Sequence, residues 1–151
     1  MLGSNDNLMA PLVFRILLAI VAVYALLRGS RDERVVGLIC VAGTFLTQLV
    51  LSPLTQRFAG METHALLVDI IVFAGFLWVT LRSERFWPLW ITGLQLTTIM
   101  GHLLKGVDSD LLPRAYGAAM TFWSYPIILI LAIGTWRTHR RRSRNADIAN
   151  A

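Results

Sequence analysis

Residues 65–81 read ALLVDIIVFAGFLWVTL, and this stretch, which contains Asp69 as its single charged side chain, decides the fold. A helix needs about 20 mainly apolar residues, within a working range of ~17–25, to cross the hydrocarbon of a bilayer. Lipid offers no hydrogen bonds to free backbone groups, so a crossing segment has to be helical. The stretch therefore predicts a transmembrane helix.

Further apolar blocks of similar length lie on both sides of residues 65–81. The five expected spans are Leu8–Leu27, Val35–Leu51, Ala65–Leu81, Phe86–Leu104 and Ala115–Trp136. Their connections are short, so neighbouring helices should pack antiparallel. Pro126 lies inside the fifth span and should kink it. We expect residues 1–136 to form one all-α bundle, a polytopic integral membrane protein with five transmembrane helices.

The composition of the 151-residue chain supports this prediction. Hydrophobic residues make up 56% of the chain and charged residues 15%, against ~45–50% and ~25% in soluble domains. Residues 1–10 contain no Lys or Arg, and Arg15 interrupts the next apolar run. We therefore expect the first block to be a retained span and not a cleaved signal peptide. The lone Cys40 can form neither an internal disulfide nor a metal site by itself, and it should serve as a small apolar residue.

The basic residues predict the orientation, because cytoplasmic loops of membrane proteins are enriched in Lys and Arg. With the N-terminus outside, ten arginines would face the cytoplasm: Arg28, Arg31, Arg34, Arg82, Arg85, Arg137, Arg140, Arg141, Arg142 and Arg144. Three basic residues would then face outside: Arg57, Lys105 and Arg114. We expect the N-terminus out and the C-terminus in. Residues 137–151 should form a disordered basic cytoplasmic tail that touches anionic lipid and does not bind nucleic acid.

Polar side chains within the expected spans gather in the outer half of the membrane. Ionisable residues there are costly and usually face the bundle interior. Arg15 and Asp69 fall at a similar depth, so we expect them to form an ion pair. The whole expected pocket consists of Arg15, Gln48, Asp69, Gln95, Thr98, His102 and Tyr125. The alternatives to the ion pair are a neutral Asp69 bonded to a hydroxyl and an Arg15 that reaches the headgroups. The alternative to a pocket is that these groups are interhelical hydrogen-bonding residues without a ligand.

A metal or haem site is a weaker hypothesis. His64 begins the third expected span and His102 lies near the end of the fourth, so antiparallel packing would place both near the outer surface. With Asp108 they could ligate a divalent metal, and the two histidines could ligate haem b. The chain has no H-E-x-x-H, no C-x-x-C and no nucleotide-binding glycine pattern. We therefore expect a protein without a cofactor, and the sequence favours a non-enzyme over an enzyme.

Several short segments in the second half of the chain carry a family resemblance. They are Arg85-Phe86-Trp87-Pro88-Leu89-Trp90, Gly101-His102-Leu103-Leu104-Lys105 and Gly134-Thr135-Trp136-Arg137. These segments resemble a group of small alphaproteobacterial inner-membrane proteins of unknown function. The resemblance covers roughly the third to fifth spans. It implies a bacterial inner membrane as the location and assigns no catalytic role to any residue.

Three functions are consistent with these features. The first is a non-catalytic accessory or structural subunit that packs against a larger membrane complex, because the bundle is small and carries no sharp catalytic motif. The second is a small carrier or channel that uses the outward-facing polar pocket. The third is a membrane redox or metal-binding protein that uses His64 and His102. Partners beyond the lipid bilayer, such as a larger complex, follow from the first hypothesis.

Overall fold

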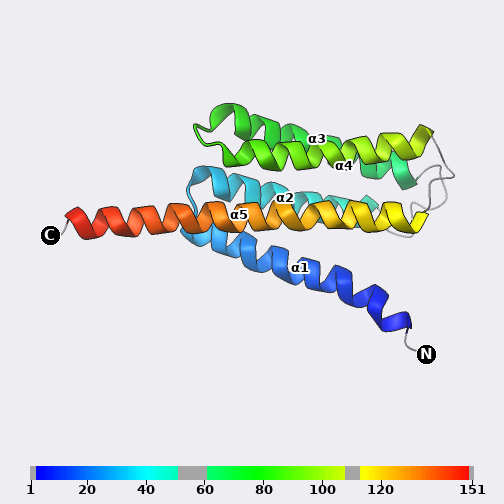
Figure 1. Ribbon diagram of the computed structural model, residues 1–151, viewed down its shortest axis with the longest axis horizontal. Helices are drawn as coiled ribbons and strands as arrows, with labels where there is room; N and C mark the ends of the chain where they lie inside the picture. The colour runs from blue at the N-terminus through cyan, green and yellow to red at the C-terminus, as the bar shows by residue number, and fades with distance from the viewer. Residues whose placement is uncertain (1–2, 51–60, 108–112, 150–151) are drawn as a thin grey trace.

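The chain folds into five α-helices, shown in a computed structural model (Figure 1). The structure describes the backbone of residues 3–50, 61–107 and 113–149, and the side chains of residues 12–49, 64–103 and 124–148. The helices are α1 (Gly3–Arg28), α2 (Arg31–Val50), α3 (Met61–Arg82), α4 (Trp87–Val107) and α5 (Pro113–Ala149). No strand occurs within these residues. The prediction of an all-α protein is confirmed.

The helices form a closed ring in which each packs against its neighbours in the chain. The order is α1, α2, α3, α4 and α5, and α5 returns to contact α1. The last helix also touches α2, so it contacts three of the other four helices (Figure 1). Short turns at residues 29–30 and 83–86 join α1 to α2 and α3 to α4. Because the number of helices is odd, the start of α1 and the end of α5 lie at opposite ends of the bundle.

The basic tail differs from the prediction. Residues 137–149 are helical and continue α5, which is 37 residues long and contains Pro126 without a break in the helix. The tail was expected to be disordered, and for residues up to Ala149 that prediction is wrong. Arginine and alanine are good helix formers. The start of the tail is also fixed by the bond between Thr138 and Glu33.

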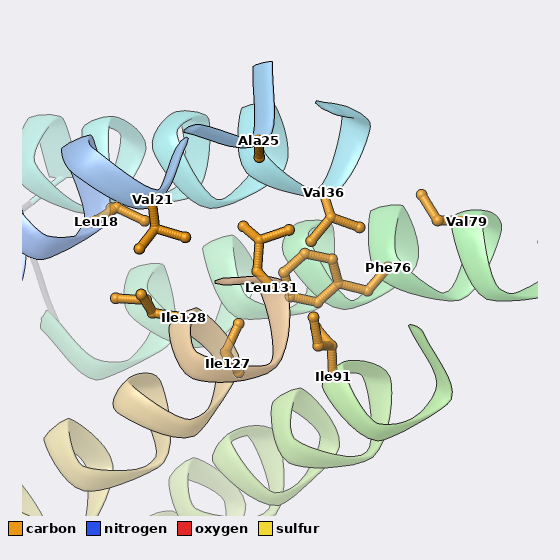
Figure 2. Close-up of a cluster of buried hydrophobic side chains, with 10 residues drawn as sticks. All are labelled: Leu18, Val21, Ala25, Val36, Phe76, Val79, Ile91, Ile127, Ile128 and Leu131. Carbon is orange, nitrogen blue, oxygen red and sulfur yellow. The ribbon is translucent and has the colours of Figure 1, made fainter. Parts of the chain in front are cut away.

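One apolar core holds all five helices together. Its buried members are Leu18, Val21, Ala25, Val36, Phe76, Val79, Ile91, Ile127, Ile128 and Leu131, drawn in Figure 2. Phe76 on α3 and Leu131 on α5 are both drawn near the centre of the cluster (Figure 2). Cys40 is partly buried and packs against the same cluster, in keeping with a role as a small apolar residue.

Two glycines bring α2 and α3 close together. A Cβ atom at Gly43 on α2 would lie 2.7 Å from Val72 Cγ2 on α3. In the reverse direction, a Cβ atom at Gly75 on α3 would lie 3.0 Å from Ile39 Cδ1 on α2. Small residues at such positions allow helix backbones to approach closely. Each glycine thus provides the space that a branched side chain of the other helix fills.

A single stretch in the described parts of the chain, His64–Arg82, is both long and apolar enough to cross a membrane. Its mean hydropathy is 2.1, and 17% of its residues are buried within the bundle. The core helix of a soluble protein is mostly buried, whereas most residues of this stretch lie outside the buried core. By length and composition it is a candidate span, and it corresponds to the third expected one. The other four expected spans stay predictions.

Candidate functional site

A polar cluster connects α3 and α4. Asp69 Oδ2 on α3 lies 2.9 Å from His102 Nε2 on α4, and Gln95 Nε2 donates a hydrogen bond of 3.0 Å to Asp69 Oδ1. Gln95 and His102 are seven residues apart, which places them on one face of α4 two turns apart. Both oxygens of the carboxylate therefore have partners on the neighbouring helix. These three side chains are the part of the expected pocket that the structure brings together.

The other members of the expected pocket have separate surroundings. Arg15 and Gln48 are exposed. Thr98 donates to the Leu94 carbonyl of its own helix at 3.4 Å. The ring of Tyr125 meets Phe14 edge to face, with ring centroids 5.5 Å apart.

The predicted ion pair between Arg15 and Asp69 is wrong. α1 and α3 are not neighbours in the ring of helices, and the Asp69 carboxylate is occupied by His102 and Gln95. Sequence depth along the membrane normal placed Arg15 and Asp69 at one level, but it carries no information on the order of helices around the bundle. A histidine on the adjacent helix takes the place that was assigned to the arginine.

The structure does not assemble the expected metal ligands within its described residues. There, no three side chains of the types His, Cys, Asp and Glu gather as a metal site requires. His64 is exposed, and His102 contacts Asp69. Asp108 lies outside the described residues.

A second polar network lies at the arginine-rich end of the bundle, and the sequence analysis missed it. Glu33 on α2 is completely buried. Its Oε1 atom accepts from Arg85 Nη1 at 2.6 Å and from the Thr138 hydroxyl at 2.7 Å. Arg85 also donates to the Thr138 hydroxyl. The Glu33 network, which we define as Ser30, Glu33, Arg85 and Thr138, thus joins α2, the α3–α4 turn and α5.

Glu33 is positioned by a capping box at the start of α2. The Ser30 amide donates to Glu33 Oε2 at 2.8 Å, and the Ser30 hydroxyl donates to the same oxygen. Ser30 precedes the helix and Glu33 is its third residue, which is the S-x-x-E pattern of a capping box. Gly29 makes the turn possible, because a Cβ atom there would lie 2.3 Å from the Ala25 carbonyl oxygen. The signal that could have revealed Glu33 is therefore this local pattern.

The hydrogen bonds of Glu33 decide its protonation state. Burial raises the pKa of Glu33, but the hydroxyls of Ser30 and Thr138, a backbone amide and the charge of Arg85 together outweigh burial. The net effect is a pKa below the ordinary value of 4.5. Glu33 is therefore an anion at neutral pH, and this end of the bundle holds a buried ion pair with all its oxygens bonded.

Further polar contacts surround the Glu33 network. Ser83 donates to Asp32 Oδ2 at 2.7 Å, which adds a link between the α3–α4 turn and α2. Arg82 lies 4.8 Å from the centre of the Trp78 ring, and Arg140 lies 5.5 Å from that of Trp136. Tryptophan rings flanked by arginine are typical of the boundary between lipid and water.

Two cavities open at this same end. The larger, about 360 Å³, lies between the start of α4 and the middle of α5, and Arg85, Trp87, Gly134 and Arg137 are among its walls. The smaller, about 280 Å³, lies between α2 and α3 beside Arg31 and Arg82. The Asp69 cluster is not in the walls of either cavity.

The comparisons with known proteins add no homologue: neither a protein family, nor a curated protein, nor a solved structure matches this chain. The resemblance to alphaproteobacterial membrane proteins stays a prediction. Functional conclusions therefore rest on the chemistry of the two polar groups and the cavities.

Proposed function

We propose that this chain is a multi-pass membrane protein whose five helices all cross a bacterial inner membrane. The observation that carries the proposal is the distribution of apolar side chains. Among the described residues, 28 large hydrophobic side chains are exposed, against 13 buried hydrophobic residues, and the exposed ones occur on all five helices. A monomer in water rarely exposes an apolar surface this extensive, whereas lipid requires one.

The helix lengths are consistent with this proposal. The first four helices contain 26, 20, 22 and 21 residues. At about 1.5 Å per residue each is about 30 Å or longer, which matches the hydrocarbon thickness of ~30 Å. Arginine and tryptophan gather at one end, which the positive-inside rule assigns to the cytoplasm. The basic tail of α5 then lies inside and the N-terminus outside.

Within the membrane we assign the protein a non-catalytic accessory role, packed against a larger complex. Two carboxylates of the described residues have internal partners on each oxygen: Asp69 binds Gln95 and His102, and Glu33 binds Ser30 and Arg85. A carboxylate that itself takes a proton from a substrate must lie within hydrogen-bond reach of that proton, so carboxylates whose oxygens are both bonded inside the bundle favour structural roles. The long basic end of α5 is available for a partner.

Two measurements test these proposals. A reporter fused after Ala151 should be active only in the cytoplasm, and the protein should remain in the membrane pellet after alkaline carbonate extraction. Release into the supernatant would contradict membrane insertion. The tagged chain, purified in mild detergent at native expression, should carry a stoichiometric larger partner. Elution as this chain alone would argue against the accessory role and leave the topology intact.

A second candidate function is a proton-coupled carrier, and one contact favours it. Carboxylate–histidine pairs inside membrane bundles are common in proton relays, and Asp69 and His102 form such a pair. Asp69→Asn would then abolish uptake of a substrate while the protein stayed abundant. Loss of abundance without a transport phenotype would favour the structural role.

A further inference from the structure

The larger cavity has a graded wall along one face of α5. Ile130, Ile133, Gly134, Arg137 and Arg141 all line it. Their spacings of three, one, three and four residues place them on a single helical stripe. The stripe is apolar toward the centre of the bundle and basic toward the tail. A ligand that fits along it has an apolar part and an anionic part.

The cavity walls carry a net positive charge at the end nearer the tail of α5. Arg85 already binds Glu33, whereas Arg137 and Arg141 are exposed and have no ion-pair partner among the described residues. Glu84 also lines the cavity and contributes one negative charge. Two unpaired guanidinium groups against one carboxylate leave a net positive wall. Arginine forks match the oxygens of a phosphate better than any other side chain does.

Trp87 adds an unused hydrogen-bond donor to the cavity wall. Its ring packs on Gly134, where a Cβ atom would lie 3.4 Å from Trp87 Cδ2. Its indole Nε1 is buried and has no hydrogen-bond partner within the described residues. Buried polar atoms normally have partners, so this N–H is suited to an oxygen acceptor from outside the chain.

We propose that this cavity binds the phosphate headgroup of an anionic phospholipid, with Arg137 and Arg141 on the phosphate and Ile130 and Ile133 against the upper acyl chain. The inference rests on the proposed membrane location, which would place the cavity at the cytoplasmic interface. A volume of about 360 Å³ is at the small end of ligand sites and suits a headgroup. Basic pockets between helices on this side of a membrane are suited to anionic headgroups.

The smaller cavity is a weaker candidate for the same chemistry. Its two arginines are Arg31 and Arg82, and Arg82 is stacked on Trp78. Asp32 stands in the same wall and offsets one of the charges. The headgroup is therefore assigned to the cavity between α4 and α5.

The test compares two double variants of the full-length protein that lose the same charge. Arg137→Gln/Arg141→Gln removes the two cavity arginines, and Arg142→Gln/Arg144→Gln removes two exposed tail arginines outside the cavity. Each protein is placed in nanodiscs of phosphatidylcholine with increasing phosphatidylglycerol of the same acyl chains. Bound phosphatidylglycerol is then measured by native mass spectrometry. Parallel samples in detergent receive inorganic phosphate or glycerol phosphate, which present the anion without an acyl chain.

We expect the cavity variant to bind phosphatidylglycerol about tenfold or more weakly than the wild type, and the tail variant to stay within about threefold. Equal losses in both variants would overturn the proposal, because a diffuse attraction to the basic tail would then explain the binding. Binding of inorganic phosphate as tight as that of the lipid would overturn the lipid as the source of the phosphate.

The experiments distinguish a failure of the membrane proposal from a failure of the headgroup proposal. Carbonate extraction of the wild type is done first, and release of the protein would refute insertion itself. A protein that stays in the membrane but shows no preference for phosphatidylglycerol refutes the headgroup site alone.

Discussion

Arg85 Nη1 lies 2.6 Å from Glu33 Oε1 and connects the α3–α4 turn to the first turn of α2. Glu33 is fully buried, whereas the side chain of Arg85 is 39% exposed. The pair is thus asymmetric. Loss of Arg85 leaves the Glu33 carboxylate buried without its cationic partner, whereas loss of Glu33 leaves an arginine that water can reach. This asymmetry gives the first two predictions.

Replacing Arg85 by Gln should lower the free energy of unfolding by about 2–3 kcal/mol. The value lies below the ~3–5 kcal/mol for breaking a fully buried pair, because Arg85 is partly exposed. Denaturant titration of the purified protein in mild detergent measures it. Arg82→Gln is the matched control: it removes an arginine stacked on Trp78 and should cost less than ~1 kcal/mol. Equal losses in the two variants would contradict a special role for the buried pair.

Glu33 should make the protein acid-sensitive. Its pKa is lowered by folding from the ordinary value of 4.5, so the unfolded chain takes up the proton first as the pH falls. The stabilisation is therefore fully present above pH 4.5 and is lost as the pH falls through the lower pKa of the folded state. Thermal midpoints measured from neutral to acidic pH should fall more steeply for the wild type than for Glu33→Gln. Parallel curves would show that another acid controls the transition.

The Asp69–His102 pair should be energetically coupled. Asp69→Asn and His102→Gln each remove the carboxylate–imidazole contact while roughly keeping the size of the side chain, and each should cost about 1–3 kcal/mol. The double variant should cost less than the sum of the two, with a coupling energy of about 0.5–3 kcal/mol. Chemical denaturation of all four proteins gives the cycle, and Gln48→Ala, at an exposed position, is the control. Strict additivity would mean that the contact contributes nothing.

Gly43→Ala should destabilise the bundle by about 1–3 kcal/mol, because the new methyl group would meet Val72 at 2.7 Å. Val72 is branched at Cβ and has little freedom to move aside. The matched control is Gly93→Ala on α4, where nothing lies within 4 Å of the added atom. That variant should be neutral or more stable by up to ~1 kcal/mol, owing to the higher helix propensity of alanine. Opposite signs for the two substitutions are the expected result, in thermal unfolding followed by circular dichroism.

Thr80 and Thr92 should contribute little to stability although their hydroxyl oxygens lie 2.8 Å apart between α3 and α4. Each hydroxyl has a single proton, and a carbonyl oxygen of its own helix, that of Phe76 or Pro88, competes for that proton. Interhelical hydrogen bonds of this kind average ~0.6 kcal/mol. Thr80→Val should therefore lower the free energy of unfolding by less than about 1 kcal/mol. A loss above 2 kcal/mol in the same denaturant titration would show that the bond is far stronger than such pairs usually are.

Much of the fold followed from apolar block length alone. Some helix boundaries lie within one residue of the predicted ones. Among them are the end of α1 at Arg28, the end of α3 at Arg82 and the start of α4 at Trp87. The starts of α1, α2 and α3 lie four or five residues before the predicted ones, and α5 runs on to Ala149 through the basic tail. Hydropathy marks where lipid contact stops, but a helix continues as long as its residues favour it.

The polar site was predicted in part. Asp69, Gln95 and His102 do come together, because a stripe on α4 must face an adjacent antiparallel helix. The predicted pairing of Arg15 with Asp69 was wrong because the order of the helices around the bundle is a tertiary property. The glycine contacts were missed for the same reason: Gly43 and Gly75 form no local motif, and their partners lie on another helix. Glu33 was missed although its capping-box pattern is local, because it lies between two apolar blocks and not within one.

The length of α5 has a mechanical consequence. Its 37 residues span about 55 Å, well beyond a hydrocarbon layer of ~30 Å. The tail is thus a stiff arm and not a loose tether, and Thr138 near its base is bonded to Glu33. A protein that binds the last turns of α5 and tilts them would transmit the motion through Thr138 to α2 and the α3–α4 turn.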